Sequence, residues 1–202
     1  MSTISTLLEN LKFGESILIE HSSTAPVHIL FYELIKWAEL NSYPILIDDF
    51  LDSLYLYKKH IKLSGLSNQP INNVVVIKLG GILEVGHVIG KVSVSESTIL
   101  QKEYDYVFER VPHKRFLNIV VGFDKYLFLL QEKKELLSAL HDILKYVGNK
   151  RRIAFYFINQ DLIEVAAPAA LPILEEGFTR VVRIGRNESA PPTVKLLKSI
   201  VD

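Results

Sequence analysis

Two imidazole side chains and a run of hydroxyl side chains lie in a short segment that directly follows an apolar run. The segment consists of His21, Ser22, Ser23, Thr24, Ala25, Pro26, Val27 and His28. Imidazole rings act as general bases or metal ligands, and hydroxyl groups in a turn between a strand and a helix bind phosphate oxygens or Mg²⁺. This histidine segment is therefore the first candidate for chemistry in the chain.

A phosphate-binding turn of the form G-x-x-x-x-G-K-[ST] gives each fixed residue a separate task. The glycines let backbone N–H groups converge on phosphate oxygens, the lysine neutralises charge and the hydroxyl group binds Mg²⁺. When Ile17–Glu20 is taken as the preceding strand, His21 and Pro26 occupy the glycine positions. Val27 then replaces the lysine and His28 the hydroxyl residue. Because proline has no N–H and valine no charge, the sequence predicts that this turn does not bind ATP in the usual way.

Carboxylates end or follow two further apolar runs. Asp48 and Asp49 close one run, and Asp124 directly follows another. Since ligands of an open parallel sheet bind beyond the carboxyl ends of its strands, we expect these carboxylates to share one edge with the histidine segment. Together with Glu20 and His28 they make a divalent metal site an alternative. The chain has no H-x-x-H or H-E-x-x-H spacing, however, so we expect turn caps and a surface histidine, without a metal.

Two other kinds of site have little support in the sequence. Hydrolysis by an activated serine normally uses a G-x-S-x-G turn, which the chain lacks, and the hydroxyl residues before Pro26 are typical of a helix cap. The glycines between Gly80 and Gly90 do not form the G-x-G-x-x-G turn of a dinucleotide site. We therefore expect no bound cofactor.

The elements that position these residues are predicted to alternate between strands and helices. The predicted strands are Ser16–Glu20, Pro44–Asp48, Asn73–Leu79, Phe116–Phe123, Arg152–Ile158 and Thr179–Gly185. Helix-period stretches cover Pro26–Leu40, Leu51–Leu63 and Asp124–Val147, and a Pro-broken loop precedes a last strand or helix. Near-continuous apolar strands are typical of sheets covered on both faces. The pattern predicts one α/β domain over residues 1–202, with a mostly parallel central sheet flanked by helices.

Two segments are candidate contact surfaces for another chain. Gly80–Ser97 is predicted to be a loop followed by an extra strand, with a hairpin at the sheet edge as one form, and Lys91, Val92, Ser93 and Val94 are the candidate partner edge. Val165–Phe178 carries small and apolar residues around two prolines. The alternatives are an internal hairpin for the first segment and a buried crossover helix for the second.

Composition limits the classes of partner. The chain has 202 residues, 49% of them hydrophobic, and its 23 Lys plus Arg balance its 23 Asp plus Glu. A neutral balance disfavours nucleic acid and anionic membranes as partners, and no apolar run is long enough to cross a bilayer. The absence of cysteine excludes disulfides, thiolate nucleophiles and Cys-bound zinc, and fits a cytoplasmic protein.

Three local basic clusters leave a DNA-binding groove as an alternative. They are His113-Lys114-Arg115, Lys150-Arg151-Arg152, and the group Arg180, Arg183 and Arg186. Two clusters come just before predicted strands, and the Lys150 cluster follows a helix end, where cations complement the helix dipole. We therefore interpret them as solvated structural charge.

The order of the segments resembles that of the RecA/KaiC-like ATPases. LLENLKFGESILIEH is similar to the lead-in and first strand of that group, and YPILIDDFLDSLYLYKKHIKLSGL to its second strand and following helix. FLNIVVGFDKYLFLL resembles the Walker B strand, and RRIAFYFINQDLIE the strand after it. The chain looks most like a small archaeal family of this type that has no assigned activity.

The resemblance implies catalytic positions from which this chain departs. Phe50 and Leu51 fall where an acidic pair is expected, about two residues after Asp48 and Asp49, and Gly122 falls where the Walker B aspartate is expected. With the altered phosphate turn, three elements of phosphoryl transfer are lost or displaced. We therefore predict a non-catalytic RecA/KaiC-like domain that binds a protein or peptide partner or assembles with itself. An atypical nucleotide-binding ATPase or switch, and a DNA-associated accessory protein, are the alternatives.

Overall fold

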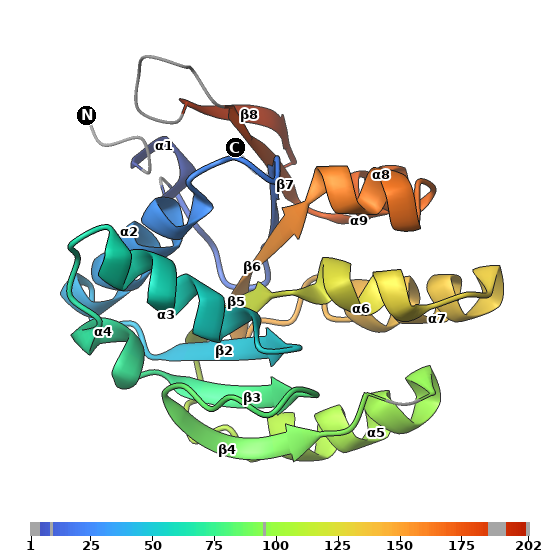
Figure 1. Ribbon diagram of the computed structural model, residues 1–202, viewed down its shortest axis with the longest axis horizontal. Coiled ribbons are helices and arrows are strands. Elements are labelled where there is room, and N and C mark those ends of the chain that lie inside the picture. Colours follow the sequence, from blue (N-terminus) through green and yellow to red (C-terminus); the bar gives the residue numbers. More distant parts are fainter. Residues whose placement is uncertain (1–4, 9, 95, 186–192, 201–202) are drawn as a thin grey trace.

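The computed structural model describes residues 5–8, 10–94, 96–185 and 193–200. An eight-stranded sheet in the order β4-β3-β2-β5-β6-β1-β7-β8 forms its centre (Figure 1). The strands are β1 Ser16–His21, β2 Ile45–Phe50, β3 Val75–Leu79, β4 His87–Val92, β5 Phe116–Val121, β6 Arg152–Asn159, β7 Arg180–Gly185 and β8 Thr193–Ser199. All neighbouring strands are parallel except β7 and β8. The predicted α/β fold with a mostly parallel sheet is confirmed.

Helices cover both faces of this sheet (Figure 1). One face carries α1 Ser5–Leu8, α2 Val27–Leu40, α3 Ser53–Leu63 and α4 Gln69–Asn72. The other carries α5 Ser97–Phe108, α6 Phe123–Leu129, α7 Lys133–Leu144, α8 Gln160–Ala166 and α9 Ala170–Gly177. Every residue of β1, β2 and β5 is buried, which is why these segments are near-continuous apolar runs in the sequence.

In two pairs of adjacent strands, β1 with β6 and β2 with β5, the connections that follow the strands turn to opposite faces of the sheet. The chain passes from β1 into α2 on one face and from β6 into α8 on the other. In the same way β2 leads into α3, whereas β5 leads into α6. Open α/β sheets bind ligands beyond the carboxyl ends of their strands, at places where the connections reverse in this way.

The prediction of a loop followed by an extra strand after β3 is confirmed, whereas its hairpin form and one predicted helix are wrong. Residues 80–86 carry the chain back along the sheet without a helix, and β4 pairs with β3 in parallel at the sheet edge. The helix predicted over Asp124–Val147 is two helices, because Leu130 is extended between α6 and α7. The apolar pattern continues across this break because Leu130 and Leu136 pack against the same core cluster, so periodicity did not reveal the break.

The later predicted segments are arranged as follows. Thr193–Ser199 forms the antiparallel edge strand β8, and the residues between β7 and β8 lie outside the described part of the chain. Val165–Phe178 contains the end of α8 and all of α9; Leu174 is buried, whereas Val165 is 80% exposed. No helix in the described residues is long and apolar enough to span a membrane.

Candidate functional site

A cleft of about 270 Å³ opens at the carboxyl edge of the sheet, between the ends of β1, β5 and β6 and the start of α3. The predicted site residues that line it are His21, Ser23, Val27, His28 and Asp124. The structure thus brings the histidine segment and one of the three predicted carboxylates together.

The turn after β1 uses its own backbone groups internally. The N–H of Ala25 donates to Ser22 O at 3.2 Å, and the N–H of Val27 donates to Ala25 O at 2.8 Å. Pro26 has no N–H to offer. None of the described residues from 22 to 26 has a positive φ, whereas a backbone nest for an anion alternates right- and left-handed residues. The turn therefore does not present a ring of converging N–H donors.

A carboxylate of the chain itself accepts a hydrogen bond from a backbone N–H of this turn. The backbone N–H of Ser23 donates to Asp161 Oδ2 at 2.7 Å, and this bond and one from the Ser23 side chain lower the pKa of Asp161. Asn159 holds Asp161 in place because its Oδ1 accepts from the N–H groups of Asp161 and Leu162 at the start of α8. An internal anion thus occupies a donor that a phosphate-binding turn offers to its ligand.

Burial disfavours the charged form of the histidine in the cleft. His21 is 8% exposed, and its burial lowers its pKa, although the nearby Asp124 and Asp161 charges oppose this shift. Burial raises the pKa of Asp124, which accepts N–H bonds from Asn159 at 2.9 Å and Lys125 at 3.0 Å. An imidazole whose charged form is disfavoured, next to Asp124 and Asp161, does not supply the fixed positive charge that a polyphosphate would need.

The position expected to carry a Walker B aspartate has no room for a side chain. Gly122 begins α6 with φ 80°, a left-handed conformation that favours glycine. A Cβ atom here would lie 2.1 Å from Ser53 Oγ and 2.5 Å from Phe50 O. Ser53 Oγ also accepts a hydrogen bond from Lys125 Nζ at 2.9 Å, so a side chain at 122 would disturb this contact.

The expectation that Asp48 and Asp49 share this edge is wrong. Both lie within β2, fully buried, and successive side chains of a strand point to opposite faces. Asp49 accepts from the N–H of Leu54 at 2.8 Å and pairs with Lys78 Nζ at 2.8 Å, so it holds the start of α3. Asp48 points to the opposite face, beneath α5.

Part of the interpretation of the basic clusters is confirmed and part is wrong. Lys114, Arg115 and Lys150 are exposed, as expected for solvated charge. Arg152, interpreted as solvated, is 1% exposed and lies inside the core. Arg180 pairs with Glu15 at 2.6 Å and Arg183 with Glu20 at 2.7 Å, while Arg186 lies outside the described residues. An arginine at the first position of a buried strand cannot be told from a surface arginine by sequence spacing alone, which is why Arg152 was missed.

His28 and the acidic residues do not converge on one point. His28 Nε2 lies 2.9 Å from Ser64 Oγ, and its ring meets His60 edge-on at a centroid distance of 5.6 Å. Within the described part of the chain, no group of three or more His, Asp or Glu side chains is arranged to hold a metal ion.

The candidate partner edge is short and irregular. Lys91 and Val92 lie in β4, but Ser93 and Val94 follow it, and the N–H of Ser93 donates to Glu103 Oε2 at 2.8 Å. The pairing of β4 with β3 shifts register between Val76 and Ile77. Bulged, short edges resist the addition of another strand.

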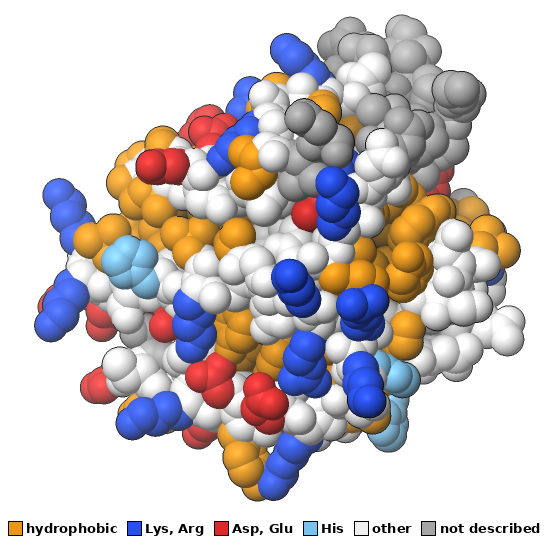
Figure 2. Space-filling model, turned by 180° about the vertical axis from the view of Figure 1, so that it is seen from behind, with side chains coloured by type: hydrophobic (Ala, Val, Ile, Leu, Met, Phe, Trp, Pro, Cys, Tyr) orange, Lys and Arg blue, Asp and Glu red, His pale blue; other side chains and the backbone are white. Residues whose placement is uncertain are grey.

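A second hollow lies on the helical surface. This α7–α9 groove, of about 320 Å³, is lined mainly by residues 130–133, Leu136, Leu137, residues 166–169 and Ile173. Nearby, Phe128 at the end of α6 is 57% exposed and Val165 at the end of α8 is 80% exposed. In Figure 2, which views the molecule from behind, hydrophobic side chains gather over α7 and α9 at the left. Contiguous exposed apolar surface marks contact sites in soluble proteins.

Comparison with known proteins shows a matching family and similar structures. Residues 6–201 match the family described as "Pyrococcus protein of unknown function, DUF257". The protein PH0250 from Pyrococcus horikoshii is 31% identical, with a TM-score of 0.87 over 100% of this chain and 94% of that one. No curated protein matches the sequence.

More distant structures share the fold at low identity. The KaiC-like protein PH0186 from P. horikoshii is 9% identical, with a TM-score of 0.61 over 93% of this chain and 80% of that one. PH0321 from the same organism, solved in complex with an unknown peptide, is 14% identical with a TM-score of 0.60 over 97% and 89%. The expected likeness to RecA/KaiC-type proteins and to an archaeal family is confirmed.

Proposed function

This chain belongs to the DUF257 family, and we propose that it is a non-catalytic RecA/KaiC-like domain that works by binding another protein chain. The observation that carries the proposal is the Asp161 carboxylate on the Ser23 N–H, at the turn where related folds would hold phosphate. Proteins that bind phosphate at a turn leave such N–H groups free for the ligand.

Three features of the cleft argue against phosphoryl transfer. The turn has no lysine, because Val27 stands at that position. Lys125, the cation among the described cleft residues, donates to Ser53 instead. Gly122 leaves no space for the metal-binding carboxylate. Catalysis of phosphoryl transfer depends mainly on positioning the reactants and neutralising charge. A cleft that lacks the groups for both tasks is therefore not expected to catalyse it.

The α7–α9 groove is the surface that best fits a protein partner, and we propose a second copy of this chain as its occupant. Phe128 and Val165 protrude beside the hollow. In a two-fold dimer the same patch meets itself, so the protruding side chains of one copy can fill the hollow of the other. The peptide bound to PH0321 supports contact with another chain as a property that this fold can have.

Light scattering with size-exclusion chromatography tests this assembly. We expect a dimer for the natural chain and monomers for Val165→Glu and Leu137→Glu, because a buried unpaired charge at an interface costs several kcal/mol, about 3 or more. Leu63→Glu is the matched control, since Leu63 on α3 is 84% exposed and Val165 is 80% exposed. The control should stay dimeric. A natural chain that is monomeric at all concentrations, or variants that all behave alike, would overturn the groove as a self-contact.

A further inference from the structure

A chain of polar side chains crosses the core on the face covered by α5–α9. Tyr104 Oη and Asn118 Nδ2 each donate to Asp48 Oδ2 at 2.9 Å. Arg152 Nη1 donates to Asn118 Oδ1, and Arg152 Nη2 donates to Tyr156 Oη at 3.1 Å. All five residues are at most 7% exposed.

Sheet register explains how these residues meet. Asn118 on β5 is opposite Leu46 on β2, so Asp48 lies two residues further along β2 on the same face. Arg152 on β6 is opposite Phe116, two residues before Asn118. The network thus runs diagonally over three strands. Burying a carboxylate and a guanidinium in this way costs free energy that an apolar core would not require.

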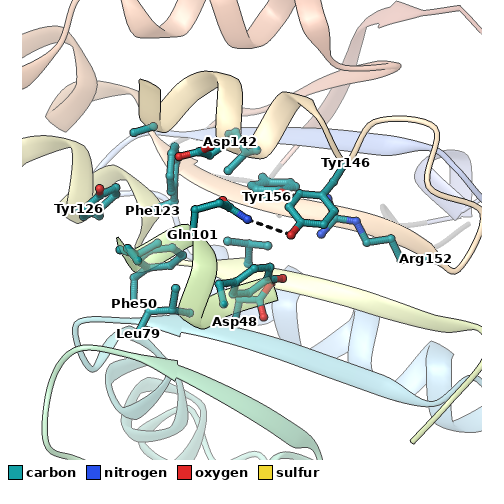
Figure 3. Close-up of a pocket in the computed structure, with 15 residues that line it drawn as sticks. Asp48, Phe50, Leu79, Gln101, Phe123, Tyr126, Asp142, Tyr146, Arg152 and Tyr156 are labelled. Carbon is teal, nitrogen blue, oxygen red and sulfur yellow. Dashed lines mark hydrogen bonds between the residues drawn. The ribbon is translucent and has the colours of Figure 1, made fainter. Parts of the chain in front are cut away.

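A cavity of about 40 Å³ lies beside this network, between the sheet and the helices α5, α6 and α7 (Figure 3). At one end lie Arg152, Tyr146 and Tyr156, and at the other Phe50 and Phe123. The walls between the ends include further apolar residues, namely Leu79, Leu100, Val120, Ala139 and Ile143.

Three buried polar atoms on residues that line this cavity lack a hydrogen-bond partner within the described residues. They are Asp48 Oδ1, Arg152 Nε and Tyr126 Oη. Each belongs to a side chain that is at most 2% exposed. Buried polar atoms are normally paired, and an unpaired one costs about 1–3 kcal/mol, so a molecule that supplies the missing partners would be stabilised here.

Two of the residues that line the cavity, Gln101 and Tyr146, also belong to a set of polar contacts between helices. Gln101 on α5 donates its Nε2 to Tyr146 Oη at 3.0 Å, the dashed contact in Figure 3. Tyr146 Oη in turn donates to Asp105, which also pairs with Lys145 at 3.2 Å. These side chains join α5 to the residues that directly follow α7.

We propose that this cavity is a binding site for a small neutral molecule with a short alkyl body and one hydroxyl or primary amide group. The size follows from the volume, since one water needs about 10–15 Å³, so 40 Å³ admits about three waters or a molecule of about three to five non-hydrogen atoms. We expect the bound molecule to be neutral. The carboxylate of Asp48 and the guanidinium of Arg152 already balance each other, so a charged ligand would have no counter-ion. The head group follows from the free acceptor on Asp48 and the free donor on Arg152.

A titration followed by ¹⁵N NMR tests the proposal, with the Arg152 Nε–H signal as the reporter. The probes are propan-1-ol and propionamide, compared with propionate and propylammonium of nearly the same shape. We expect saturable binding of the neutral probes with dissociation constants on the order of 1 mM, and at least about tenfold weaker binding of both ions.

Ala139→Leu provides the matched variant, because it fills the apolar wall without altering the polar network. It should weaken propan-1-ol binding by about tenfold or more, whereas Leu63→Ala, on the other face of the sheet, should leave binding unchanged. If Ala139→Leu fails to fold, the comparison between neutral and charged probes in the natural chain still decides. No saturable shift with either neutral probe, or a bound water signal at Arg152 Nε–H that no probe displaces, would overturn the proposal in favour of a water-filled cavity.

Discussion

At the scale of single residues, side chains and turns of this chain stand where related folds would place phosphate and metal. Asp161 bonds to the free N–H of the turn after β1, and Gly122 lies against Ser53 and the Phe50 carbonyl. The sequence predicted a turn without the fixed residues of a phosphate loop, because those residues would lie close together along the chain. It did not reveal Asp161, because the contact joins residues 138 positions apart.

The glycine at position 122 is predicted to be required for stability. Gly122→Ala places a Cβ atom 2.1 Å from Ser53 Oγ in addition to forcing a left-handed alanine, so the free energy of unfolding should fall by at least about 2 kcal/mol in urea titrations. Gly148→Ala is the control, since Gly148 has a similar φ of 85° and no atom within 4 Å of its added Cβ. It should cost only about 1 kcal/mol. Equal losses in the two variants would contradict this role of the contact with Ser53.

The buried carboxylate of Asp48 predicts a specific dependence of stability on pH. Burial raises the pKa of Asp48 to about 6, above its ordinary value of 3.8. The folded state therefore binds the proton more tightly, and the stability gained below pH 4 is lost as the pH rises through 6, by about 3 kcal/mol in total. Asp48→Asn cannot ionise, so its free energy of unfolding should fall less than that of the natural chain between pH 4 and pH 7. Parallel pH profiles for the two proteins would show that Asp48 does not carry this dependence.

At the scale of elements, local patterns predicted the elements that lie in the centre of the sheet. Runs such as Phe116–Val121 are buried on both faces and therefore apolar throughout. The patterns predicted an extra strand after β3 but not its parallel pairing with β3, because the two strands are joined without a helix and β4 is only partly buried. Nor did they predict the polar network, since Asn118 and Arg152 meet only through the register of β5 and β6.

The connection between β3 and β4 is predicted to depend on one carboxylate. Asp52 accepts from the N–H groups of Ile82 and Leu83 at 2.8–3.1 Å and pairs with Lys78 at 2.5 Å. Asp52→Ala should therefore increase amide hydrogen exchange at Ile82 and Leu83 by about tenfold or more, because their bonds inside the loop are lost. Glu84→Ala is the control: it removes only an exposed pair with Lys91 and should leave these amides unchanged. Unchanged exchange in Asp52→Ala would mean that the loop is held by other contacts.

At the scale of the whole molecule, two proteins can share a fold without sharing the residues that carry out chemistry. A KaiC-like structure that is only 9% identical overlaps 93% of this chain, yet the present cleft has an altered turn and an internal carboxylate. Fold likeness therefore supports the architecture, and the proposed function rests on the residues of the site. The absence of ATP chemistry is a prediction that the sequence alone supports, whereas the groove between α7 and α9 required the arrangement of helices in space.

Calorimetric titration of the natural chain with ATP and Mg²⁺, combined with a phosphate-release assay on the same sample, tests the central claim most directly. With Asp161 on the Ser23 N–H and Val27 in place of lysine, we predict no binding heat up to about 1 mM nucleotide and no phosphate release above the rate in buffer. Saturable binding with a dissociation constant in the micromolar range, or phosphate release that increases in proportion to protein concentration, would contradict the account and favour an atypical nucleotide-dependent switch.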